Sequence, residues 1–165
     1  SSGATVLLLS CPICYKVFRE NYDLEGIEIL HHSEYIDRLI SEKKLDISRT
    51  DLRYAYHDPC ELGRGCGIYE EPRNVVSAAG VLVEGAKKEK ESICCGGSLG
   101  SLTLSDEQRK RLAENALGNL TADSPDAVVT ACPLCKNTFN RYAAVPVLDI
   151  AEIVAQASGR NNIKQ

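Results

Sequence analysis

The sequence predicts an α/β fold in which a parallel, Rossmann-like sheet is flanked by helices. Three observations predict this class. Short apolar runs alternate with longer amphipathic segments, a cysteine group directly follows three of these runs, and an internal repeat has the same strand-then-helix order. Hydrophobic residues make up 44% of the 165-residue chain, which is enough for a core of ordinary domain size.

Four strands can be placed from local patterns. Residues 6–9 and 127–130 are aliphatic and β-branched runs that suit buried parallel strands, and each leads through a CxxC motif into a helical segment. Further strands are expected at 52–56 and 81–84. The carboxyl ends of parallel strands lie on one edge of a sheet, so the cysteine groups that follow them could meet there.

A long helix is expected over residues 106–120. Ser105 is a suitable N-cap, and acidic residues occupy the first turn, where they complement the helix dipole. The apolar stripe of this helix passes through Leu112, Ala116 and Leu120. A second helix is expected to start near Tyr69.

The internal repeat indicates how the chain is organised. Residues 6–18 (VLLLSCPICYKVF) match 127–139 (AVVTACPLCKNTF), and residues 27–36 match 145–154. A lone cysteine and a cysteine pair stand upstream of the second copy only. We therefore expect two parts that pack as one globular unit: residues 1–50 are the C-terminal part of a first repeat, and residues 51–165 are a complete second repeat.

Charge and hydropathy exclude several classes of function. The chain has 19 Lys and Arg against 23 Asp and Glu, and no extended basic block, so no nucleic-acid partner is expected. The apolar start is too short for a signal peptide or a membrane span, so no direct membrane insertion is expected. We expect a cytoplasmic protein with reduced thiols, and any association with a membrane would be made through partner subunits.

Five of the eight cysteines predict a metal site. They form a single residue, an adjacent pair and a CxxC motif: Cys60, Cys94, Cys95, Cys132 and Cys135. Thiolates select zinc, copper(I) or iron–sulfur clusters, and zinc is satisfied by four ligands, so a fifth cysteine favours a centre with several metal atoms. A structural zinc module and a CxxC dithiol–disulfide exchange protein are the alternatives.

Three segments carry a resemblance to a known family. HDPCELGRGCGIYEEPR at 57–73, CCGG at 94–97 and ACPLC at 131–135 resemble the cysteine-rich CCG domain. That domain occurs in heterodisulfide reductases and in the iron–sulfur subunits of glycolate oxidase, lactate-utilisation and anaerobic glycerol-3-phosphate dehydrogenase systems. The resemblance extends roughly over residues 4–158, and it identifies the two parts of the chain as one truncated and one complete CCG unit.

The resemblance implies a cofactor and a role. The five cysteines would hold a noncubane [4Fe-4S] cluster that transfers electrons or reduces a disulfide, while some copies of the domain bind Zn²⁺ instead. The implied partners are other parts of a redox complex, such as a flavin dehydrogenase or a ferredoxin-type domain. Clusters of this kind are oxygen-sensitive, so we expect a preparation made in air to be empty or to hold zinc. The substrate and any catalytic residue remain unassigned.

Cys11 and Cys14 cannot complete a second five-cysteine site within this chain. We expect this pair to be free or oxidised, with zinc binding as the alternative, for which His31 and His32 could supply nitrogen. The two histidines are otherwise expected to be solvated loop residues. Cys66 is expected to be a small residue in a glycine-rich turn at 63–67.

Five other residues are candidates for contact with the cofactor or substrate. Gly96 and Gly97 could bring backbone N–H groups close to sulfur. His57 could be a ligand or proton donor, although orienting a loop is the simpler role. Arg64 could face an anionic substrate or the negative charge of a cluster, and so could Arg73, which could equally pair with Glu70 on the helix that starts near Tyr69.

Overall fold

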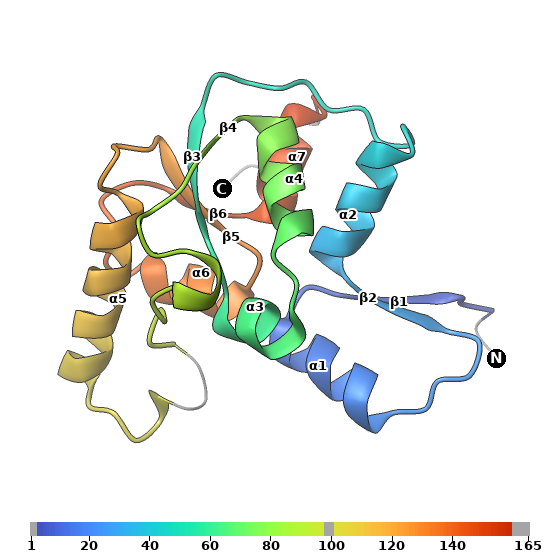
Figure 1. Ribbon diagram of the computed structural model, residues 1–165, viewed down its shortest axis with the longest axis horizontal. Coiled ribbons are helices and arrows are strands. Elements are labelled where there is room, and N and C mark those ends of the chain that lie inside the picture. Colours follow the sequence, from blue (N-terminus) through green and yellow to red (C-terminus); the bar gives the residue numbers. More distant parts are fainter. Residues whose placement is uncertain (1–2, 98–100, 160–165) are drawn as a thin grey trace.

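The chain forms two parallel sheets flanked by helices, which confirms the predicted class (Figure 1). The structure is a computed structural model that describes residues 3–97 and 101–159. The four-stranded sheet has the order β4-β3-β5-β6, and the two-stranded sheet pairs β1 with β2. The strands are β1 Val6–Leu9, β2 Glu28–His31, β3 Arg53–His57, β4 Val81–Val83, β5 Ala127–Thr130 and β6 Val147–Asp149.

Helices follow most of the strands. They are α1 Pro12–Asn21, α2 His32–Ser41, α3 Cys60–Cys66, α4 Glu70–Ala79, α5 Asp106–Leu120, α6 Pro133–Phe139 and α7 Ile150–Ala157, with a short 3₁₀ turn at Glu89–Glu91. In Figure 1, α5 lies on one side of the larger sheet, α4 and α7 lie on the other, and β1 and β2 extend away from it. Within the described ranges, no helix is both long and apolar enough to cross a bilayer.

Side chains that point alternately to the two faces of the central strands build a core on each face of the larger sheet. Tyr54 and Tyr56 of β3 and Val129 of β5 belong to the cluster formed with α4 and α7. Ala55 and Val128 belong to the cluster formed with α5 and α6. Successive side chains of a strand point to opposite faces, so one pair of neighbouring strands supplies both cores.

The internal repeat is visible in the topology. β1, α1, β2 and α2 follow one another as β5, α6, β6 and α7 do, and the strand pairs share a register, since Leu9 pairs with His31 where Thr130 pairs with Asp149. The copies differ in burial: every residue of β5 is buried, whereas Leu8 of β1 is 46% exposed. Among the described strands, β5 also pairs with β3, and β1 pairs only with β2.

Matching capping boxes start the helices that follow β2 and β6. His31 caps α2 with Glu34 as the reciprocal acceptor, and Asp149 caps α7 with Glu152 in the same role. His32 Nε2 lies 3.2 Å from Asp149 Oδ1, so the two copies meet at these caps. The expectation that His31 and His32 are solvated is wrong: they are 0% and 5% exposed, because the caps of the two copies face each other.

Two expectations about helices are also corrected. The glycine-rich turn expected at 63–67 is the last part of α3, which ends at Gly67 with a φ of 77°. Position 63 favours glycine because a Cβ there would lie 2.6 Å from Tyr69 Cε1. In α5 the capping box of Ser105 is confirmed, but the buried stripe consists of Ala113, Ala116, Leu117 and Leu120, while Leu112 is half-buried. Strand β3 begins one residue later than expected.

Burial of His31 predicts a dependence of stability on pH. Desolvation, together with the neighbouring His32, lowers the pKa of His31 from its ordinary 6.5 to about 3. The unfolded chain therefore takes up this proton at higher pH than the folded chain, so the stability that neutral His31 contributes is complete above pH 6.5 and is lost as the pH falls toward 3. We expect this loss to amount to roughly 2–4 kcal/mol.

Urea unfolding between pH 3.5 and 7 would measure this loss. His31→Asn retains an N-cap side chain without a titrating group, so the variant should lose less stability than the parent as the solution is acidified. Equal losses in the two proteins would show that His31 does not carry the effect.

Candidate metal centre

Three segments bring cysteines to the carboxyl ends of β3 and β5. Cys60 is the first residue of α3, Cys132 is the N-cap of α6, and the Cys94-Cys95 pair comes from the segment after the 3₁₀ turn. The strand ends lie side by side because His57 pairs with Thr130 in the parallel register. The predicted position of these cysteines at strand-to-helix turns is confirmed for Cys60 and Cys132.

The five sulfurs form a continuous series of contacts. Side-chain interactions link Cys60 with Cys94, Cys94 with Cys95, and Cys135 with Cys132, and each of them shifts the pKa of the thiols involved. The Cys95 and Cys135 sulfurs lie 3.2 Å apart, which joins the two halves of the series. Cys95, Cys132 and Cys135 are buried, and Cys60 and Cys94 are half-buried. All eight cysteines of the chain lie in the described ranges and are free thiols.

Hydrogen bonding divides these thiols into donors and acceptors. Bonds from Cys60 and then Cys95 lower the pKa of Cys94 to about 2, and the same Cys60–Cys94 bond raises the pKa of Cys60. A bond from Cys135 lowers the pKa of Cys132 to about 7, with help from the backbone N–H groups of Cys135 and Leu134. Cys94 and Cys132 are thus the thiolates already favoured before a metal binds, and binding would displace the remaining protons.

The glycines after the cysteine pair direct their N–H groups at sulfur, as predicted. The Gly96 N–H donates to Cys94 Sγ and the Gly97 N–H donates to Cys95 Sγ, each at 3.4 Å. Gly96 has a φ of 78°, and a Cβ on it would lie 3.0 Å from the Arg109 carbonyl oxygen. The backbone therefore turns close to α5 in a conformation that a side chain would hinder.

Replacing Gly97 tests how tightly this turn is held. A Cβ on Gly97 would collide with Thr138 Oγ1 and lie 3.4 Å from the Leu134 carbonyl oxygen. We expect Gly97→Ala to lower the free energy of unfolding by roughly 1–3 kcal/mol, as measured in urea. The matched control is Gly118→Ala in α5, where nothing lies within 4 Å, and it should stabilise the protein by roughly 0.5–1 kcal/mol. Similar changes in both variants would contradict the proposed close approach.

His57 lies against the buried sulfurs. One imidazole nitrogen of His57 and the sulfurs of Cys95 and Cys135 all lie within 4.8 Å of one another. His57 Nε2 is buried without a hydrogen-bond partner. Its ring makes an edge contact with Phe139 at 4.7 Å. Burial lowers the pKa of His57 to about 4, so the imidazole is neutral at pH 7 and its free nitrogen can meet a metal or an inorganic sulfide. The donor set therefore fits a metal centre.

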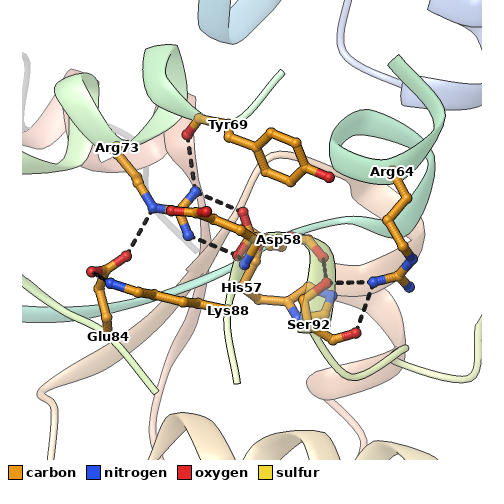
Figure 2. Close-up of polar contacts among 10 residues, drawn as sticks. His57, Asp58, Arg64, Tyr69, Arg73, Glu84, Lys88 and Ser92 are labelled. Carbon is orange, nitrogen blue, oxygen red and sulfur yellow. Dashed lines mark hydrogen bonds and ion pairs between the residues drawn. The ribbon is translucent and has the colours of Figure 1, made fainter. Parts of the chain in front are cut away.

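A buried ion pair ties the end of β3 to α4 and to the segment before the cysteine pair. Both terminal nitrogens of Arg73 donate to the Asp58 carboxylate, at 2.7 and 2.8 Å, and its Nε donates to Glu84 (Figure 2). Asp58 also accepts from the Glu89 N–H. Arg73 therefore does not pair with Glu70, which was the alternative partner expected from the sequence. Asp58 precedes Cys60 by two residues, so the ion pair between Arg73 and Asp58 fixes the turn that carries Cys60.

Arg64 anchors the same segment from α3. Its Nη1 donates to both the carbonyl and the hydroxyl oxygen of Ser92, each at 2.8 Å, and Ser92 Oγ lies 3.5 Å from the Asp58 carbonyl (Figure 2). Ser92 is two residues from Cys94. Sequence reasoning identified Arg64 and Arg73 but missed Asp58 and Ser92, although an acid directly before the Pro59-Cys60 turn was a usable signal.

Breaking the buried pair should destabilise the fold. Arg73→Met would leave the Asp58 carboxylate buried with one fewer charged partner, and we expect a loss of roughly 3 kcal/mol in the free energy of unfolding. Arg38→Met is the control, because its bidentate bond to Glu28 lies at the surface, and it should leave stability unchanged within error. Equal effects on the midpoint of urea unfolding would show that burial does not strengthen the Asp58 pair.

The remaining cysteines lie outside the series of five. Cys11 and Cys14 are hydrogen-bonded to each other, which raises the pKa of Cys14, and Cys14 is exposed. The two histidines suggested as zinc ligands for this pair each use a ring nitrogen elsewhere, since His31 Nδ1 lies 2.8 Å from Ser33 Oγ and His32 Nε2 pairs with Asp149. Cys66 ends α3, and burial raises its pKa.

The family is decided by a direct match. Residues 54–140 match the model of the CCG cysteine-rich domain, a span that contains all five cysteines of the series. The chain belongs to the CCG cysteine-rich domain family.

The chain matches parts of longer proteins. The chain is 32% identical to an EtfAB:quinone oxidoreductase of Syntrophomonas wolfei over 94% of its own length and 24% of that protein. It is 31% identical to a subunit of the dihydromethanophenazine:CoB–CoM heterodisulfide reductase of Methanosarcina acetivorans, over 96% of this chain and 42% of that one. The chain is also 28% identical to an uncharacterized iron-sulfur protein of Methanococcus maripaludis, over 87% of this chain and 31% of that protein. The chain thus spans less than half the length of each of these relatives.

Proposed function

We propose that this CCG domain is the iron–sulfur redox domain of an oxidoreductase of the heterodisulfide reductase kind. In this proposal Cys60, Cys94, Cys95, Cys132 and Cys135 hold a noncubane [4Fe-4S] cluster, which would supply one-electron transfer or the reduction of a disulfide. The carrying observation is that five sulfurs lie in one unbroken series, one sulfur more than a zinc ion takes.

The residues around the sulfurs have roles in this proposal. The Cys94 and Cys132 thiolates bind first because their pKa values are lowered. The Gly96 and Gly97 N–H groups remain as donors to ligand sulfur, which stabilises negative charge there. His57 stays neutral and buried beside Cys95 and Cys135, where it presents a nitrogen to the centre while the surrounding apolar residues exclude water.

The names of the relatives support the proposal that this chain works with other parts of a redox complex. They are described as an oxidoreductase, a heterodisulfide reductase subunit and an iron-sulfur protein. We place the chain accordingly in a complex whose other parts, a flavin dehydrogenase or a ferredoxin-type domain, exchange electrons with it. The proposed location is cytoplasmic, with any contact to a membrane made by partners. Residues 1–50 are proposed as the end of a first CCG unit, and 51–165 as the complete second unit.

Zinc is the second candidate, and one observation favours it. His57, Cys95 and Cys135 already place three ligand atoms within 4.8 Å of one another, and Cys132 or Cys94 would close a tetrahedral set. Such a site would stabilise the fold without turnover, and it would leave at least one cysteine of the series unused.

The deciding experiment is metal and acid-labile sulfide analysis of the chain purified and reconstituted without oxygen, with an EPR spectrum of the oxidised form. We expect about four irons and four sulfides per chain, and their loss in Cys94→Ser. Cys66→Ser is the matched control and should retain the full content, because Cys66 lies outside the series. One zinc without sulfide under these conditions would establish the structural module instead.

A further inference from the structure

The two CxxC motifs of the repeat face one hollow. It is lined by Pro12, Ile13, Pro59, Cys60, Glu61, Cys95, Cys132, Leu134 and Cys135. Ile13 and Leu134 are the third residues of CPIC and CPLC, so equivalent positions of the two copies line the same space. Four of the five candidate ligands line the hollow too, and therefore the incomplete copy provides part of the wall of the complete copy's metal centre.

Helix α1 is held over this hollow by contacts that do not involve Ile13. Tyr15 is 1% exposed and its ring makes an edge contact with His31 at 5.9 Å, while Pro12 is buried. Further along the helix, Lys16 Nζ lies 3.9 Å from Glu61 Oε2 at the start of α3. Figure 1 shows α1 beside α3. The position of the helix is thus set by Tyr15, Pro12 and Lys16.

The wall that α1 adds, Pro12 and Ile13, is apolar, and Pro59 and Leu134 continue it. These four side chains offer no hydrogen bond to a water molecule beside the sulfurs, and Glu61 adds a charged side chain to the lining. Cys60 is half-buried, whereas the other three cysteines that line the hollow are buried. An apolar shell of this kind controls solvent access to a thiolate-held metal and, through it, the redox potential.

We propose that Ile13 is the access-determining residue of this centre: it limits how readily water and small thiol-reactive molecules reach the sulfurs that line the hollow. The consequence for redox chemistry rests on the proposed function, but access to the sulfurs does not. Ile13 is the informative position because it belongs to α1, so its substitution leaves the α6 turn with Leu134 and both of its cysteines unchanged.

The test is alkylation of the full chain, reduced and free of metal, by N-ethylmaleimide, with the rate at each cysteine read by peptide mass spectrometry. In Ile13→Ala we expect labelling of Cys60 and Cys132 to be roughly fivefold faster than in the parent. Ile13→Phe should slow the same two positions. Cys14, which is already exposed, should keep its rate in both variants and serves as the internal reference.

Val17→Ala is the matched control, since Val17 lies on the same helix, is 42% exposed and does not line the hollow. It should leave all the rates unchanged. Thermal unfolding of each variant shows whether the chain stays folded, and Ile13→Val replaces Ile13→Ala if the latter does not. Parent-like rates in folded Ile13→Ala and Ile13→Phe would overturn the proposal, and so would an equal acceleration in Val17→Ala.

A second measurement separates this proposal from the iron–sulfur assignment. In anaerobically reconstituted protein, iron release to a chelator should be faster in Ile13→Ala than in the parent. If no iron is incorporated while the alkylation rates change as expected, the assignment of the cluster fails and the role of Ile13 stands. If iron is incorporated and neither alkylation nor iron release responds to Ile13, the role of Ile13 fails alone.

Discussion

The parallel pairing of β3 with β5 is the constraint on which the metal centre depends. The register that sets His57 opposite Thr130 places the ends of both strands at one level of the sheet. Cys60 follows one end and Cys132 the other, so two of the cysteine-bearing turns are neighbours before any side chain contributes. A shift of one residue would turn the alternating core residues of β3 to the wrong faces, so the packing of both cores protects the geometry of the site.

The third cysteine segment does not follow its strand, β4, directly and is held by charge instead. Arg73 and Asp58 are buried together, and Arg64 reaches Ser92, so the residues leading to Cys94 are attached to both α3 and α4. The three cysteine segments are thus held in position by two kinds of interaction. Backbone pairing sets the CxxC turn and Cys60, while buried ionic and hydrogen bonds bring the cysteine pair against them, and the pKa values of the thiols respond to that contact.

Local patterns predicted much of this architecture, and tertiary contacts explain the rest. The strands at 6–9 and 127–130, the cap at Ser105 and the glycine N–H donors depend on neighbours in the chain, and all were predicted correctly. The clash that a side chain at position 63 would make with Tyr69 depends on contacts outside the local sequence, and so does the pairing of His32 with Asp149, 117 positions away. The partner of Arg73 could not be read from helix spacing, because Asp58 lies in another element.

The long separation between β3 and β5 has a consequence for how the protein acquires its cofactor. The contact between His57 and Thr130 joins residues 73 positions apart, so the edge that gathers the cysteines forms only after a large loop has closed. Until then the thiols are separate and accessible, and an oxidant can pair them wrongly. Cysteines that this long-range pairing brings together are therefore organised for metal binding in the folded chain and not before it.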